Sequence, residues 1–375
     1  MKKSIIIPLL LATGAVISLS GLYTMEFMRI DARFALFVTE MQQSGIGWFP
    51  TLFGKPYTDY PSVPIILMYL ASLGGTHLNM LTATLPNALA GLVVLLFTFL
   101  LGERARKNVG IYGAGLCLFA FEFLTLMRHP GSDLMVAAVT VVAVFTIYTA
   151  LRGDGGKRLA WLPLLLLTGY ICRGPLGFII PTAAVLAVYL AFGCWWRSIG
   201  WLIGSGVLFM GSLVLTLVAC RDAGGRELAQ MFLNDQLFGR IEQGRPCWYY
   251  FTNAVGSFAP TYPLAIVTVI FYARGIFAKP QRGDSQDRVF LRMLTFWALL
   301  ILVGMSVPGT KHLRYIAAAI PALGLLAAWI FANPNQLIAF ELLRRLFFLI
   351  ARFLPFFGLA AIVATGIVLN LLQID

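Results

Sequence analysis

Ionisable side chains in this apolar sequence gather in five short stretches, each beside a long hydrophobic run. The stretches are DARFALFVTE (31–40), KPYTDYPS (55–62), RHPGSD (128–133), ICRGP (171–175) and GTKHLRY (309–315). They supply cations, which are Arg128, Arg173, Lys311 and Arg314, and carboxylates, which are Asp31, Asp59 and Asp133. Arginine suits a phosphate because its planar fork donates two parallel hydrogen bonds. A positioned carboxylate can take up a proton. Together the stretches indicate chemistry on an anionic group.

Asp31 follows an apolar run at residues 4–23 that is long enough to cross a bilayer. An acid at the edge of a membrane is costly and is therefore a candidate for function. A purely structural pairing with Arg29 or Arg33 is the alternative. Glu40 lies nine residues further on, half a helical turn away, so we interpret it as an orienting partner rather than a second base.

The composition is that of a membrane protein. The 375 residues are 59% hydrophobic and 12% charged, with a mean hydropathy of +0.83. A soluble domain is about one quarter charged. We therefore expect an all-α polytopic protein of about eleven transmembrane helices, with an uncleaved first span. The expected spans are 4–23, 79–101, 109–126, 133–151, 159–172, 175–193, 200–219, 256–276, 292–307, 314–332 and 352–371.

The charges orient these spans. The expected topology places seventeen Lys and Arg with five Asp and Glu on one side, and eleven of each kind on the other. The basic side is cytoplasmic by the positive-inside rule, which accounts for the net +12 without a nucleic-acid partner. The N-terminus is then cytoplasmic. The stretch at 61–73 is too short to span, and we expect it to be a juxtamembrane helix.

The expected topology leaves two large outer segments, 24–78 with juxtamembrane helices and 220–255, within a single transmembrane domain that occupies 1–375. All five stretches lie on this outer side. Of the five cysteines, Cys220 and Cys247 bracket the second segment, and spacing alone leaves a disulfide between them open. We find no Walker loop, GxSxG or HExxH motif.

The stretches occur in a recognisable order. DARFALFVTEM followed by GKPYTDYPSVPIILMYLASL, then RHPGSDLMVAA, GYICRGPLGFIIP and KHLRYIAAAIPALGLLAA, resemble the GT-C glycosyltransferases over residues 25 to about 332. The nearest branch contains the polyprenyl-phosphate-sugar transferases, such as the lipid A aminoarabinose transferases and the protein O-mannosyltransferases. Each motif alone is weak, whereas the ordered set is specific.

The resemblance implies a catalytic cavity at the outer, periplasmic face of a bacterial inner membrane. It implies a sugar donor on a polyprenyl phosphate and an essential aspartate in the first loop, here Asp31. The family's aspartate after the third span matches Asp133, and its phosphate-binding cations match Arg173 and Lys311 or Arg314.

The sequence departs from the family pattern at several positions. Ala32 replaces an acid, Phe34 a tyrosine, and Tyr60 the lysine of a Lys-Pro-Pro motif. A metal held by Asp59 and His312 lacks an obvious third ligand, because Gln243, Gly244 and Arg245 stand where some relatives have histidine. We therefore expect no firm cofactor. The outer C-terminal soluble domain of many relatives is also missing, which blurs the acceptor.

These features predict an inverting glycosyltransferase that moves a sugar to a hydroxyl of a lipid, glycan or protein. Asp31 is the expected base, and Asp133 completes the catalytic pair. The expected substrate-binding residues are Glu40, Asp59, Tyr60, Arg128, Arg173, Lys311 and Arg314. His129 and His312 are interpreted as loop hydrogen bonders. The competing class is a transporter or flippase of a lipid-linked or anionic solute, although transporters bury binding residues near the membrane midplane.

Overall fold

The computed structural model of the chain describes residues 3–239, 244–281 and 284–332, together with 341–342, 345–346 and 349. The chain divides into two compact units, residues 1–328 and 329–375. The first elements are α1 (Lys3–Leu19), α2 (Ile30–Ser44), β1 (Thr51–Leu52), β2 (Lys55–Pro56), α3 (Ser62–Ala71), α4 (Met80–Ala105), α5 (Val109–Phe119), α6 (Phe121–Met127) and α7 (Asp133–Leu151). The others are α8 (Leu162–Arg173), α9 (Pro175–Ala191), α10 (Trp195–Leu233), α11 (Tyr249–Ser257), α12 (Thr261–Phe277), α13 (Gln286–Ser306) and α14 (Ile320–Ala332).

The helices confirm an all-helical, multi-pass class. Within the described ranges, six helices are long and apolar enough to cross a membrane, and two bent pairs raise the number to eight. The count of eleven stays a prediction, and the expected span 352–371 lies outside the described residues. The second outer segment is more helical than expected, because α10 continues through a kink at Gly224 and Gly225 and ends in a π-helical turn, Asn234–Phe238.

One expected span is bent, and a second begins at a bend. The expected span 109–126 consists of α5 and α6, which meet at 74° because Ala120 is extended, with φ −69° and ψ 119°. The expected span 256–276 corresponds to α12, and α11 meets it at 118° where Pro260 precedes α12. Proline cannot donate a backbone hydrogen bond, so it favours such a break.

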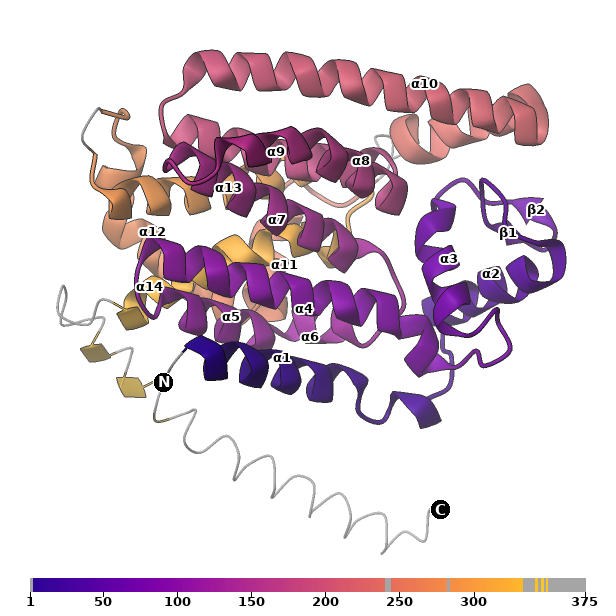
Figure 1. Cartoon of the computed structure of the whole chain (residues 1–375), viewed down its shortest axis with the longest axis horizontal. Helices are drawn as coiled ribbons and strands as arrows, with labels where there is room; N and C mark the ends of the chain where they lie inside the picture. Colours follow the sequence, from indigo (N-terminus) through magenta and orange to yellow (C-terminus); the bar gives the residue numbers. More distant parts are fainter. Residues whose placement is uncertain are drawn as a thin grey trace, which may run out of the picture. The chain divides into compact units, whose positions relative to one another are not determined.

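The middle of the first unit is built around α7. In its most apolar window 72% of α7 is buried, against 11% of α10. The sequence of α7 is apolar on every side, which suits a helix surrounded by α4, α8 and α9. Figure 1 shows α10 running beside α9 and α8, where its exposed face is rich in large apolar side chains.

The first outer segment folds on its own aromatic core. A hairpin of β1 and β2 pairs Thr51 with Pro56, and it lies between α2 and α3. The expected helix at 61–73 is α3. The buried core between α2 and α3 contains Phe34, Phe37, Val38, Met41, Tyr60, Ile65 and Met68.

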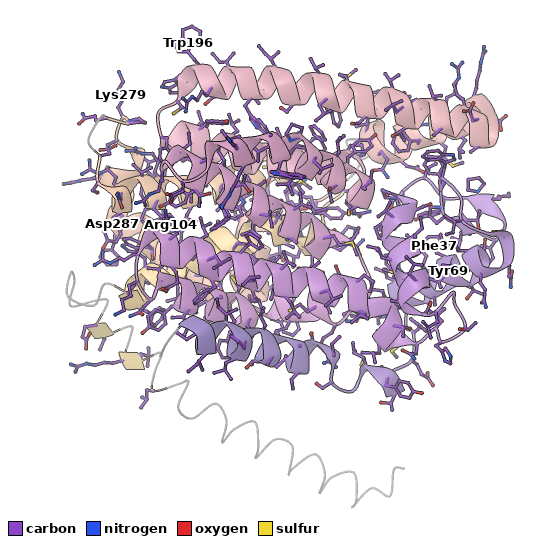
Figure 2. The ribbon with its side chains drawn as sticks, in the orientation of Figure 1. Phe37, Tyr69, Arg104, Trp196, Lys279 and Asp287 are labelled. Carbon is purple, nitrogen blue, oxygen red and sulfur yellow. The ribbon has the colours of Figure 1, made fainter. Side chains whose placement is uncertain are left out.

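Charged residues that the expected topology places on the cytoplasmic side lie together at one end of the bundle. Arg104 pairs with Asp154, and Arg106 pairs with Asp287 at 2.9 Å. Figure 2 shows Arg104 and Asp287 at the end away from Phe37 of the first outer segment. These ion pairs join segments that the charge pattern assigns to the same side, and the orientation in a membrane stays a prediction.

Arg292 of α13 is fully buried at this same end. Its guanidinium donates hydrogen bonds to the carbonyls of Ala191, Gly275, Ile276 and Ala278, and it pairs with Asp284 at 3.0 Å. The carbonyls of Gly275, Ile276 and Ala278 lie at the end of α12, where a helix has acceptors without internal partners. Arg292 thus joins α9, α12 and α13.

We predict that Arg292→Met destabilises the protein by about 3–5 kcal/mol, because it leaves Asp284 and several carbonyls without a partner. The matched control is Arg288→Met, since Arg288 also pairs with Asp284 but is 45% exposed. An exposed pair contributes about 0–1 kcal/mol. Thermal unfolding in detergent measures both variants, and equal melting temperatures would refute the role of Arg292.

Candidate functional site

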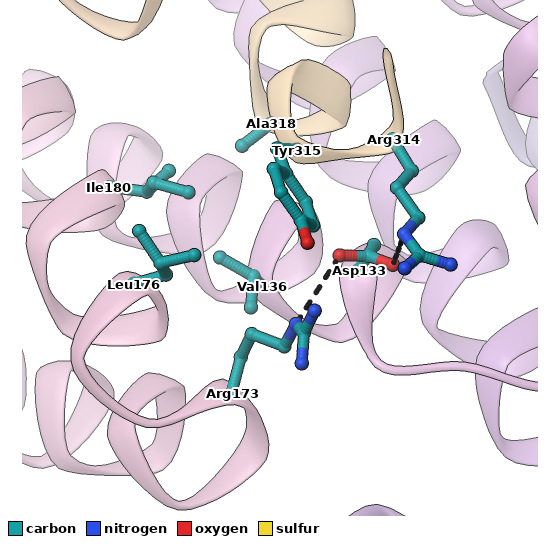
Figure 3. A pocket seen from close by; sticks show the side chains of 8 residues that line it. All are labelled: Asp133, Val136, Arg173, Leu176, Ile180, Arg314, Tyr315 and Ala318. Atoms are coloured by element: carbon teal, nitrogen blue, oxygen red, sulfur yellow. Dashed lines mark ion pairs between the residues drawn. The ribbon is translucent and has the colours of Figure 1, made fainter. Parts of the chain in front are cut away.

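Three charged side chains, Asp133, Arg173 and Arg314, meet at the other end of the bundle (Figure 3). Asp133 opens α7, Arg173 closes α8, and Arg314 lies in the 3-10 helix Leu313–Ala319. Asp133 stands between the cations, with Oδ1 3.6 Å from Nε of Arg173 and Oδ2 3.7 Å from Nε of Arg314. The start of a helix also favours its negative charge. We call these three residues the arginine cluster.

The turn after Arg173 fixes where its side chain begins. Gly174 has φ +63°, a value that favours glycine, and Pro175 starts α9. The two helices then pack in close contact, because a Cβ on Gly177 would lie 1.9 Å from the carbonyl oxygen of Gly169. The ICRGP motif is therefore a tight helix–helix turn that presents Arg173 to the end of the bundle.

Aromatic rings surround the guanidinium of Arg173, which is only 2% exposed. Its Cζ lies 4.4 Å from the ring centre of Tyr60 and 5.6 Å from that of Tyr315. One Nη donates to the backbone carbonyl of Asp59 at 3.3 Å. A desolvated cation over a ring gains about 2 kcal/mol or more. Tyr60, which departs from the family's lysine, thus serves as a platform for Arg173.

The arginine cluster retains unused donors. The ion pairs to Asp133 are too long for hydrogen bonds, and in the described part of the chain the buried Nε and Nη2 of Arg173 and the Nε of Arg314 have no hydrogen-bond partner. Buried donors of this kind are normally satisfied. All three nitrogens belong to side chains that line one pocket, with Val136, Leu176, Ile180, Tyr315 and Ala318 as its apolar and aromatic wall. An oxyanion is the chemical group that these donors fit.

Asp31 lies in the first turn of α2, and its side chain is 10% exposed. Its Oδ2 is 2.8 Å from Nδ1 of His129. His129 is 43% exposed and belongs to the loop that leads into Asp133. We call these two residues the Asp31–His129 pair.

The Asp31–His129 pair is linked to the arginine cluster in two ways. Phe34, one turn after Asp31, packs edge-on against Tyr60, with 5.2 Å between the two ring centres. The guanidinium of Arg173 lies over the same Tyr60 ring. The RHPGSD loop holds both His129 and Asp133. Asn87 of α4 fixes this loop by donating to the carbonyls of Leu126 and His129. The expected aspartates and two of the expected arginines therefore come together.

Two of the expected cations are bound elsewhere. Arg128 donates to the carbonyls of Ile17 and Ser20 at 2.7 and 3.0 Å, so it satisfies the end of α1. Lys311 is 4% exposed, and its ammonium donates to the carbonyls of Arg245 and Pro308. Neither cation is paired with Asp133 in the described part of the chain, and their roles in substrate binding stay predictions.

Glu40 holds the tip of the β1–β2 hairpin. It accepts hydrogen bonds from the backbone N–H groups of Phe53 and Gly54 at 2.5 and 3.1 Å. Burial acts to raise its pKa, but hydrogen bonds from Thr51 and from these two backbone groups lower it below its ordinary value. Glu40 thus orders the tip of the hairpin, and its roles as an orienting partner and in substrate binding stay predictions.

Four residues that the sequence analysis did not predict as site residues belong to the site. His129 pairs with Asp31, and Tyr315 packs on Arg173. Glu122 of α6 interacts electrostatically with Asp133, Arg314 and His129, because the bend at Ala120 turns α6 toward them. Gln236 donates to the carbonyls of Thr58 and Asp59. His129 and Tyr315 carried a sequence signal, because they belong to the RHPGSD and GTKHLRY stretches, whereas Glu122 and Gln236 carried none.

A groove of about 790 Å³ begins beside the arginine cluster. Gly174, the neighbour of Arg173, and Gln236 both line it. Its walls come from residues 46–49, the start of α3, α8 and α10, and most of the wall is apolar, including Phe49, Ile66 and Leu215. The groove therefore offers an apolar surface that includes Gly174, the residue next to Arg173.

Metal ligands and thiols form no centre within the described ranges. In that part of the chain, no group of three or more His, Cys, Asp and Glu side chains is arranged to hold a metal. Cys220 is buried and Cys247 is exposed, and both are free thiols.

Solved structures share this fold. ArnT from Cupriavidus metallidurans bound to undecaprenyl phosphate matches 98% of the chain with a TM-score of 0.71 at 18% identity. The Archaeoglobus fulgidus oligosaccharyltransferase tethered with an acceptor peptide matches 93% with a TM-score of 0.57 at 15% identity. The chain spans 65% of the length of the first protein and 54% of the second. No protein-family model and no curated protein sequence matches the chain. These likenesses show that the chain has the GT-C fold, as the ordered motifs predict.

The Asp31–His129 pair predicts a pH-dependent contribution to stability. The hydrogen bond to Asp31 raises the pKa of His129 above its ordinary 6.5; burial opposes this, the charges of Asp31 and Glu122 add to it, and Arg128 opposes it. A raised folded-state pKa means that the contribution is fully present below about pH 6.5 and is lost as the pH rises through the folded-state value. The melting temperature of the wild type should therefore exceed that of His129→Gln most at low pH.

Melting curves in detergent between pH 5.5 and 8.5 measure this difference, with His77→Gln as the control because His77 is exposed. A difference that stayed constant or grew with pH would contradict the pairing.

Proposed function

We propose that the protein is a glycosyltransferase that moves a sugar from a polyprenyl-phosphate donor to an acceptor hydroxyl of a lipid, glycan or protein. The observation that carries the proposal is the set of unused hydrogen-bond donors on Arg173 and Arg314. The loop that bears His129 also bears Asp133, and Gly174, which follows Arg173, lines the apolar groove. An amphipathic phosphate donor fits both features at once. Its phosphate meets the arginine cluster, and its prenyl tail follows the groove.

Donor binding in this proposal depends on charge and on desolvation. Two guanidinium groups supply planar forks for the phosphate oxygens, and Asp133 holds the forks apart and aimed at one pocket. An Arg–phosphate contact in a buried site is stronger than the same contact in water. The apolar tail is removed from water in the groove, at about 0.8 kcal/mol per buried methylene.

The transfer needs one proton acceptor and one stabilised leaving group. The acceptor oxygen forms a bond to the anomeric carbon while the bond from that carbon to the phosphate oxygen breaks. The electron pair stays on the phosphate, where Arg173 and Arg314 stabilise the growing charge. The hydroxyl proton is taken up at the Asp31–His129 pair. A direct displacement of this kind inverts the anomeric carbon.

The charge distribution supports a periplasmic site in a bacterial inner membrane. The charged network of Arg104, Arg106 and Asp287 lies at the end opposite to the first outer segment. The basic excess belongs to the cytoplasmic side by the positive-inside rule. The arginine cluster and the Asp31–His129 pair would then face the periplasm, with the N-terminus in the cytoplasm.

We predict that Asp31→Asn lowers transfer by about 10²–10⁴-fold, because the amide cannot drive proton removal. The assay is incubation of the purified protein with radiolabelled polyprenyl-phosphate sugars and an envelope lipid extract. Asp287→Asn is the matched control, since Asp287 pairs with Arg106 at the other end. Wild-type turnover by the Asp31→Asn variant would contradict the proposal, and movement of label without covalent transfer would indicate a transporter.

We also predict that Arg173→Met weakens the binding of undecaprenyl phosphate at least about tenfold, because the phosphate loses a buried fork and Asp133 loses a partner. Arg173→Lys should recover only part of the loss, since lysine keeps the charge without the fork. Ligand-induced shifts in melting temperature measure binding, and Arg288→Met is the control. Unchanged binding by Arg173→Met would place the phosphate elsewhere.

A further inference from the structure

The Asp31–His129 pair has an unequal exposure that bears on which residue meets the acceptor. The side chain of Asp31 is 10% exposed, whereas that of His129 is 43% exposed. The carboxylate is the less accessible of the two groups, so a hydroxyl that enters from solvent reaches the ring more readily. Access therefore favours His129 as the residue that touches the acceptor.

The contact to Asp31 also determines which ring nitrogen is used. Nδ1 of His129 lies 2.8 Å from Oδ2 of Asp31. A carboxylate accepts a hydrogen bond, so Nδ1 carries a proton in this contact. In neutral imidazole only one nitrogen is protonated, which leaves Nε2 with a lone pair. Among the described residues, Nε2 has no hydrogen-bond partner.

The groups around His129 support a base at this position. Asp31 contacts the ring from α2, and its charge and that of Glu122 in α6 favour the imidazolium that proton uptake creates. Arg128, in the same loop, opposes it, but its guanidinium is held by the carbonyls of Ile17 and Ser20. A buried carboxylate hydrogen-bonded to Nδ1 of a histidine is the arrangement that orients the histidine base of Ser-His-Asp hydrolases.

We propose that Nε2 of His129 is the atom that accepts the acceptor's hydroxyl proton, and that Asp31 is a positioning residue that holds the ring and stabilises its charged form. This inference rests on the proposed function and refines the expectation that Asp31 is the base. The proton moves from the hydroxyl to Nε2 while the oxygen bonds to the anomeric carbon and the phosphate leaves with the electron pair. The loss in Asp31→Asn then arises through His129.

A substitution at His129 separates a base from a positioning group. His129→Asn keeps an N–H donor near the place of Nδ1 but has no lone pair to take a proton. If His129 is the base, the His129→Asn variant should remain folded with Asp31 partnered and lose transfer by about 10²–10⁴-fold. If His129 merely positions Asp31, the same variant should keep most of its activity, which would overturn the proposal. His77→Asn is the matched control, because His77 is exposed on the surface.

The pH profile gives a second readout. Transfer by the wild type should rise as the pH increases through the pKa of His129, since only the neutral ring accepts a proton. In Asp31→Asn this limb should move to lower pH, because the hydrogen bond and the charge that raise the pKa are lost. A limb that stays in place in Asp31→Asn would overturn the proposal.

A measurement that needs no turnover separates this inference from the proposed function. The chain has three histidines, so nitrogen NMR of histidine-labelled protein gives three imidazoles, and His129→Asn identifies the signal of interest. We expect the neutral ring of His129 to be protonated at Nδ1. Protonation at Nε2 would overturn the inference even if the wild type transfers sugar. If Nδ1 is protonated but the protein consumes no polyprenyl-phosphate sugar, the proposed function fails. The role of His129 as a base then fails with it.

Discussion

A guanidinium group inside an apolar bundle must have negative charge and acceptors around it, and Arg173 collects them from several parts of the chain. The carboxylate of Asp133 comes from α7, Tyr60 and the carbonyl of Asp59 come from the first outer segment, and Tyr315 precedes α14. Asp133 in turn holds Arg314. The cost of desolvating these cations is therefore a constraint on where α7, α8 and the outer segment can sit. The same constraint leaves guanidinium N–H donors of Arg173 and Arg314 unused, because one carboxylate cannot satisfy two guanidinium groups.

Buried arginines at the two ends of the bundle differ in how well they are satisfied. Arg292 has an acceptor for each of its three guanidinium nitrogens, so its role is to tie helices together. Arg173 has one hydrogen bond and two buried nitrogens without a hydrogen-bond partner in the described chain. A fully satisfied network rigidifies a fold, whereas a buried group without a hydrogen-bond partner calls for an explanation such as a bound ion or a catalytic role. By this criterion Arg292 is structural, and Arg173 is the candidate for ligand binding.

The sequence predicts the fold well because membrane insertion makes hydropathy and charge unusually informative. The spans at 79–101, 133–151 and 175–193 match α4, α7 and α9 closely. The bend in 109–126 and the bend between α11 and α12 were not predicted, since a hydropathy window reports apolar length and not direction. The bend at Ala120 matters for function because it brings Glu122 toward His129 and Arg314.

The candidate site was predicted only in part. Residue type and motif order single out Asp31, Asp133, Arg173 and Arg314, because charges at membrane edges are rare and costly. The same reasoning could not tell that Arg128 satisfies the end of α1 or that Lys311 binds the carbonyl of Arg245, since those partners are distant in sequence. It also gave no reason to pair His129 with Asp31, a contact across 98 positions that only the folded chain creates.

The central claim is that the arginine cluster binds the phosphate of a prenyl donor whose tail lies in the adjacent groove. A structure determined by electron cryomicroscopy with undecaprenyl phosphate tests this claim most directly. The account predicts phosphate oxygens within hydrogen-bonding distance of both Arg173 and Arg314, with the tail between α8, α10 and the start of α3. A phosphate bound away from both arginines, with a tail outside the groove, would contradict it.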